Sequence, residues 1–160
     1  IQLKLTNQNV YLYIKEYIMK KNLVKIIVTL IVLAVAIQLV PYGKDHNNPA
    51  VVAEPNWDSP ETKALYDTAC ADCHSNDTIW PWYSNIAPVS WLVQHDVEEG
   101  REHLNTSLWG QQEIETDKIS EVILEGEMPM RVYLITHPEA KLTQVEKDAL
   151  AQGLLATFSR

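Results

Sequence analysis

Cysteine is scarce in this 160-residue chain, which contains only two, Cys70 and Cys73, three positions apart. A disulfide between them would close too small a loop to add much stability. The sequence therefore excludes a fold held together by disulfides, and it indicates that the two thiols serve chemistry rather than structure.

Strand patterns are also missing, because no stretch of the chain alternates apolar and polar residues. Four segments instead repeat apolar side chains at helical spacing, and we predict helices that begin after Ser59, at 89–104, at 116–126 and after Thr143. Ser59 is a good N-cap, a glycine ends the third segment, and Thr143 with Glu146 has the capping-box pattern. The predicted fold class is all-α.

Positive charge is rare after residue 40. The first 40 residues hold five lysines against one glutamate, a net charge of +4, so the other 120 residues carry −12 of the total of −8. So acidic a domain repels phosphate backbones, which excludes nucleic acid as a partner. The acidity fits a redox partner with a basic surface, or it serves solubility alone.

The N-terminal part contains one long apolar run, Ile26–Val40, preceded by Lys20, Lys21 and Lys25. This pattern is typical of a membrane anchor or of a cleaved secretory signal, and counted from Leu23 the run reaches 18 residues. We expect an anchor, and the lysines predict that the rest of the chain lies outside the cytoplasm.

We divide the chain into four parts on this basis. Residues 1–18 are expected to be an upstream extension, since Met19 followed by lysines is a natural start. Residues 19–40 form the anchor or signal. Residues 41–58, with several prolines and asparagines and no periodicity, form a linker, and 59–160 form the folded domain.

The motif that carries chemistry is Cys70-Ala71-Asp72-Cys73-His74. C-x-x-C-H is the attachment sequence for a c-type haem, in which two thiols add to the porphyrin vinyl groups and the adjacent histidine binds the iron. A thioredoxin-type dithiol would follow a strand in a βαβ setting, which this sequence lacks. A zinc site would need two further paired ligands, and the other histidines are scattered.

A second iron ligand is predicted at Met128, in the segment Glu125 to Met130. Gly126 ends the preceding helix and Pro129 keeps Met128 out of helical geometry, which presents the thioether from a loop. The alternatives are a core role for this methionine, Met130 as the ligand, an open site, or one of the histidines His95, His103 and His137.

Aromatic and arginine side chains near the motif are candidates for contacts with a porphyrin. Trp80, Trp82 and Tyr83 follow the motif closely in a predicted loop and could pack on the porphyrin edge or in an ordinary core. Arg101 and Arg131 could pair with propionates or lie at the surface.

The stretches CADCHSNDT (70–78) and WPWYSNIAPVSW (80–91) resemble the bacterial haem-binding domain family of small cytochrome c-like proteins. HDVEEGR (95–101), GEMP (126–129) and HPEAKLT (137–143) add to the similarity, which covers about residues 57–155. The resemblance implies a helical domain wrapped around one haem, held by Cys70, Cys73 and His74, with Met128 as distal ligand. It implies no reaction and no partner.

We therefore expect one covalent haem c in a protein that transfers electrons on the periplasmic side of the bacterial inner membrane. The alternative is haem-based ligand binding or sensing, with a weak or open sixth position. We expect no enzymatic activity, because the sequence contains no other catalytic constellation. The remaining alternative is a peroxidase, which would need an open iron and a distal acid–base residue, His95 or His103.

Overall fold

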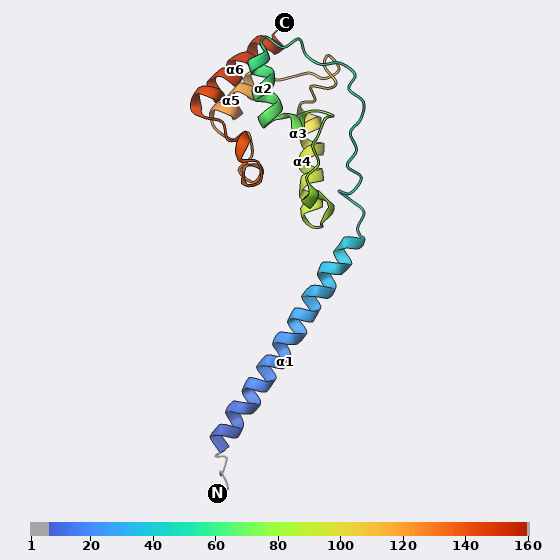
Figure 1. Cartoon of the computed structure of the whole chain (residues 1–160), viewed down its shortest axis with the longest axis vertical. Helices are drawn as coiled ribbons and strands as arrows, with labels where there is room; N and C mark the ends of the chain where they lie inside the picture. The colour runs from blue at the N-terminus through green and yellow to red at the C-terminus, as the bar shows by residue number, and fades with distance from the viewer. Residues whose placement is uncertain (1–6, 160) are drawn as a thin grey trace.

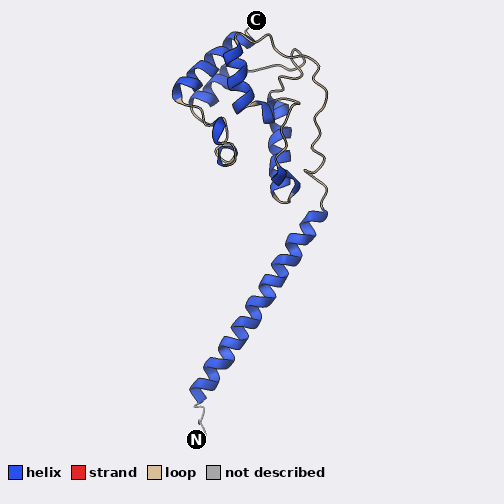
Figure 2. Cartoon of the chain, in the orientation of Figure 1, coloured by secondary structure: helices blue, strands red, loops and turns tan. Residues whose placement is uncertain are grey.

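The computed structural model describes residues 7–159 and is built from helices (Figures 1 and 2). The α-helices are α1 (Asn7–Ala36), α2 (Pro60–Ala69), α3 (Ala71–His74), α4 (Val89–His103), α5 (Thr116–Leu124) and α6 (Gln144–Phe158). Short 3-10 helices are η1 (Ile37–Leu39), η2 (Trp82–Asn85), η3 (Tyr133–Ile135) and η4 (Pro138–Ala140). Within residues 7–159 the only β pairing is an isolated bridge between Ala53 and Leu108, so the all-α prediction is confirmed.

The helix boundaries follow the capping signals. The Ser59 hydroxyl accepts a hydrogen bond from the Thr62 backbone N–H, and Thr143 and Glu146 form a complete capping box. Gly126 has a φ of 76° just beyond α5, a conformation that favours glycine. Each of the four predicted helices is therefore present.

α1 projects from the domain as a single long helix (Figure 1). Its apolar part, with η1, has a mean hydropathy of 2.3 and none of it is buried, so it is long and apolar enough to be a membrane anchor or a signal sequence. The helix already begins at Asn7, so the described part of the predicted upstream extension, residues 7–18, is helical and continuous with the apolar segment.

The core of the domain lies between α2, α5 and α6. The side chains buried there are Tyr66, Leu104, Ile123, Leu150, Ala151 and Leu154. α5 packs along α6, and α2 packs on α6 at a point where Gly153 leaves room for the Thr62 side chain. α4 packs on α3 and η2 instead, and it does not pack on α5 or α6.

Residues 41–58, predicted as a linker, lie along the domain and are hydrogen-bonded to it at several points. Asn48 donates to the Thr78 carbonyl at 2.9 Å, and the Val52 N–H donates to the Ser107 carbonyl at 2.9 Å. Near its end, the Asp58 N–H donates to the Thr157 hydroxyl at 3.1 Å. We call these residues the strap, because they connect the two ends of the domain.

We predict that Gly153→Ala destabilises the domain. A Cβ at this position would lie 2.0 Å from the Thr62 hydroxyl oxygen, and Thr62 is itself buried. Overpacking of this kind costs about 1–3 kcal/mol of unfolding free energy, to be measured by chemical denaturation. Gln152→Ala, an exposed neighbour on the same helix, is the matched control, and equal stability of the two variants would contradict the packing argument.

Candidate functional site

Cys70, Cys73 and His74 lie together at the junction of α2 and α3. Cys70 ends α2, and its carbonyl accepts hydrogen bonds from the N–H groups of Cys73, at 3.2 Å, and His74, at 2.9 Å. One helical turn therefore holds the two sulfurs and the imidazole in a fixed relation. Both thiols are free and half-buried.

The protonation state of the thiols argues against dithiol chemistry. Burial raises the pKa of Cys70 and of Cys73 to about 12, and neighbouring negative charge adds to the effect. Both groups are then protonated at neutral pH, whereas disulfide exchange requires a thiolate. The structure also shows no strand before this pair in the described residues, so a thioredoxin-type setting is missing.

The imidazole of His74 is oriented for metal binding. Its Nδ1 lies 3.2 Å from the Leu104 carbonyl oxygen, which can only accept, so Nδ1 carries the proton. Nε2 then keeps its lone pair for an iron ion, which is how metal-binding histidines are usually oriented. Burial lowers the pKa of His74 below its ordinary value, so the ring is neutral as a ligand must be.

The backbone of His74 is fixed as firmly as its ring. Its carbonyl accepts hydrogen bonds from the buried Tyr66 hydroxyl at 2.8 Å and from the Thr106 N–H at 3.0 Å. Tyr66 belongs to α2 and Thr106 follows α4, so two separate elements hold this one carbonyl. The ligand position is thus set by the core and not by the short helix α3 alone.

Gly100 is the residue of α4 that permits this arrangement. A Cβ there would lie 2.5 Å from the Cys73 carbonyl oxygen and 2.9 Å from the Cys73 Cβ. α4 therefore crosses the motif at backbone contact distance. In the sequence, Gly100 falls at helical spacing with Val97 and Leu104 within the helix predicted at 89–104. This spacing did not indicate which residue Gly100 faces.

The Arg101 guanidinium is hydrogen-bonded to several protein acceptors. It donates to the Ser75 carbonyl at 2.8 Å, to the Thr78 hydroxyl at 2.9 Å and, in the strap, to the Asn47 carbonyl and the Asn48 side chain. Four of its five donors are therefore engaged by the protein. Arg101 connects the strap to the loop after His74, a structural role that the sequence did not reveal.

The aromatic residues after the motif have protein partners as well. Trp80 stacks on His46 with 4.7 Å between ring centroids and donates its indole N–H to Asn48. The Tyr83 hydroxyl donates to Thr136 at 2.8 Å, and only Trp82 is largely exposed. His46 is thus also part of the packing of the strap.

Met128 lies on a separate loop that is connected to the motif. The Tyr133 hydroxyl, in η3, donates to an Asp72 carboxylate oxygen at 2.7 Å, and Asp72 is one of the two residues between the cysteines. The same carboxylate accepts the Ile79 N–H through its other oxygen at 2.9 Å. Burial, together with this bond to Asp72, raises the pKa of Tyr133, so its hydroxyl stays a donor.

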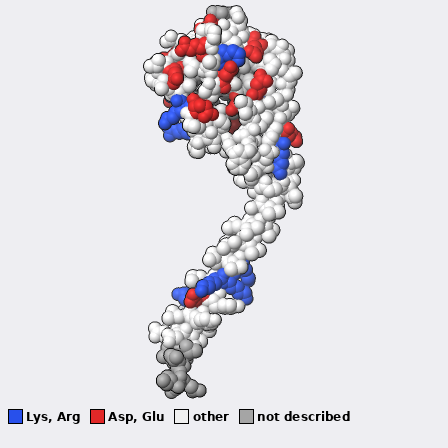
Figure 3. Space-filling model, viewed as in Figure 1, with Lys and Arg blue, Asp and Glu red and all other residues white. Residues whose placement is uncertain are grey.

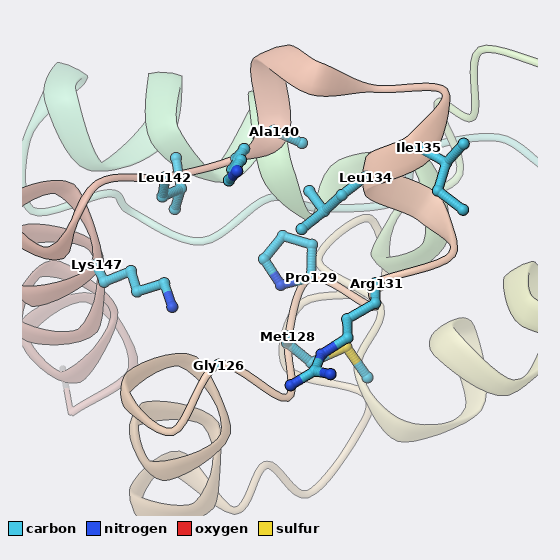
Figure 4. Close-up of a pocket in the computed structure, with 10 residues that line it drawn as sticks. Gly126, Met128, Pro129, Arg131, Leu134, Ile135, Ala140, Leu142 and Lys147 are labelled. Atoms are coloured by element: carbon cyan, nitrogen blue, oxygen red, sulfur yellow. The ribbon is translucent and has the colours of Figure 1, made fainter.

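A cavity of about 430 Å³ adjoins this loop (Figure 4). Met128, Pro129 and Leu134 line it, with Arg131 on one side and Lys147 on the other (Figure 4). Met130 is half-buried and is not one of the lining residues. Of the two methionines, Met128 is therefore the one that lines the cavity.

The three histidines considered as alternative ligands have different surroundings. His95 and His103 are exposed on α4, and His103 lies 3.9 Å from Glu99. His137 stacks on Tyr133 with 3.9 Å between centroids, and its Nδ1 lies 3.1 Å from the Tyr133 carbonyl. Within the described chain no cluster of three His, Cys, Asp or Glu side chains forms a preformed metal site.

The donor set fits a haem. Two free thiols and a neutral histidine with one ring nitrogen available lie within one turn, and Met128, on the loop that the Asp72–Tyr133 bond connects to this turn, lines a cavity. Comparison with curated proteins and with solved structures gave no significant match. A family model described as a haem-binding domain matches residues 32–156, most of the chain. The chain therefore belongs to the haem-binding domain family.

Proposed function

We propose that this haem-binding protein attaches one haem c covalently through Cys70 and Cys73 and uses it to transfer electrons at the outer face of the cytoplasmic membrane. The observation that carries the proposal is the fixed C-x-x-C-H turn, in which the Leu104 carbonyl holds the Nδ1 proton and leaves Nε2 for iron. The bound haem would supply a one-electron iron couple.

Residues of this chain would hold the group from both sides. His74 would bind the iron on one face, and Met128 would approach the other face from its loop, kept near the motif by the Asp72–Tyr133 bond. Arg131, Lys141 and Lys147 line the cavity beside Met128, and none of them forms an ion pair within the described chain. They are the available cations for two propionates.

The redox partner that suits this domain has a basic surface. Carboxylates are spread over the face of the domain seen in Figure 3, while a band of lysines lies on α1 (Figure 3). Negative potential over the domain attracts a positively charged partner and raises the rate of encounter. The same field disfavours anionic substrates.

The covalent link predicts that haem stays with the chain during denaturing electrophoresis. Each thiol would add across a vinyl double bond, with its sulfur on one carbon and its hydrogen on the other, and the resulting thioethers survive unfolding. Cys70→Ser combined with Cys73→Ser removes both bonds, so we expect haem staining of the denatured band to disappear. A colourless wild-type protein from a host with working cytochrome c maturation would contradict the proposal.

Gly100→Ala should reduce haem attachment without touching a thiol or a ligand. The new Cβ would displace the Cys73 backbone from its place under α4. We expect a destabilisation of about 1–3 kcal/mol and a several-fold lower haem content per chain, measured by the pyridine haemochrome spectrum. Glu99→Ala, exposed on the same helix, is the control, and equal haem content in both variants would show that the contact is unimportant.

The sixth ligand is tested by a pair of methionine variants. Met128→Ala should keep the haem, lower the reduction potential and allow carbon monoxide to bind, because a thioether favours ferrous iron. Met130→Ala should change neither property, since Met130 does not line the cavity. The reverse result would move the ligand to Met130, and rapid carbon monoxide binding by the wild type would support the sensing alternative.

A further inference from the structure

The end of α1 is joined directly to the corner between η2 and α4. The Gln38 side-chain amide donates to the Ala87 carbonyl at 2.8 Å, and its oxygen accepts the Ala87 N–H at 3.0 Å. Tyr42 then donates to Glu98 at 2.7 Å, and Gly43 lies against the Ser90 carbonyl, where a Cβ would be 2.3 Å away. The domain is therefore fixed to the end of the helix rather than tethered at a distance.

The length of the apolar segment determines where this corner lies relative to the hydrocarbon core of the bilayer. The 18 residues from Leu23 to Val40 span about 27 Å as a helix, close to the ~30 Å of a hydrocarbon core. If Lys20 and Lys21 lie at the inner boundary, Gln38 lies at the outer one. Ala87 is bonded to the side chain of Gln38, so it lies at the same level.

The Gln38 amide needs such a partner. A polar side chain near the hydrocarbon boundary is costly unless its donor and acceptor are satisfied. The Ala87 backbone satisfies both, and the amide also donates to the Ala34 carbonyl within the helix. The corner therefore supplies the hydrogen-bond partners that the polar Gln38 side chain needs at the end of the apolar segment.

The segment that forms the corner exposes apolar side chains and carries no charge. Trp82, Ile86 and Val89 are 76%, 48% and 41% exposed, and we call these three residues the membrane corner. No charged side chain occurs between Asp77 and His95, although the chain after residue 40 carries −12. Tryptophan is enriched at membrane–water interfaces, where an apolar ring and an N–H donor are both accommodated.

We propose that the membrane corner inserts into the headgroup region of the same bilayer that α1 spans, giving the domain a second lipid contact and one fixed orientation. The inference rests on the proposed anchoring by α1. It commits to lipid as the occupant because the corner is continuous with the end of the spanning segment. The C-x-x-C-H turn, which packs against α4, is then held at a constant height above the membrane.

The experiment is lipid-phase photolabelling of the full chain. The holoprotein is reconstituted in vesicles of phosphatidylcholine and phosphatidylglycerol that contain a phospholipid with a diazirine on its acyl chain. After illumination, peptides are examined by mass spectrometry for adducts. We expect adducts in α1 and in residues 79–94, and none in residues 50–58 of the strap.

Trp82→Ser with Ile86→Ser should lower the adduct yield at Val89 and its neighbours about tenfold, which corresponds to ~1.4 kcal/mol of lost insertion. Val52→Ser is the control, since Val52 is 61% exposed but is bonded to Ser107 at the opposite end of α4. The single variants Trp82→Ser and Ile86→Ser repeat the test if the double variant does not fold.

The photolabelling pattern distinguishes lipid contact at the membrane corner from anchoring by α1. Adducts in α1 with none in residues 79–94 would overturn the membrane corner and keep the anchor. The absence of adducts in α1 would overturn the anchor itself.

Discussion

The backbone contact between α4 and the cysteine motif is the constraint on which the site depends. Because residue 100 has no side chain, α4 lies directly on Cys73, and the following turn can reach the motif. The Leu104 carbonyl then meets the imidazole, and the Thr106 N–H meets the His74 carbonyl. A helix one side-chain diameter further away could make neither bond, and the imidazole would lose its fixed tautomer.

The same contact explains how a small all-α domain leaves space for a large cofactor. α4 is held by α3 and η2, whereas α5 and α6 form a core with α2, and α4 is not packed on α5 or α6. The two groups are connected where α2 meets α3, where Leu104 enters the core just after α4, and by the Asp72–Tyr133 bond. A porphyrin would bury apolar surface that α4 does not bury against α5 or α6.

Sequence reasoning succeeded where the signal is local. Ser59, Thr143 with Glu146, and Gly126 mark helix ends through bonds or dihedral angles within four residues, and each is found as predicted. Cys70, Cys73 and His74 share one turn for the same reason. The sequence pattern did not predict the contacts that join distant residues, such as Arg101 with Asn47 or Gln38 with Ala87. No periodicity encodes a pairing across about 50 positions.

Arg101 and Arg131 show that such distant contacts give two similar residues different roles. Both are arginines in an acidic domain, and both were candidates for propionates on composition alone. Arg101 is engaged by four protein acceptors, so moving it to a ligand would leave the carbonyl oxygen of the buried Ser75 without this donor, at a cost of about 1–3 kcal/mol. Arg131 has no such hydrogen bonds in the described chain and lines the cavity beside Met128.

Two propionates would add negative charge to a region that already carries −12 beyond residue 40. This favours a position where cations are available without breaking existing bonds. The cavity beside Met128 meets that condition, and the surroundings of Arg101 do not.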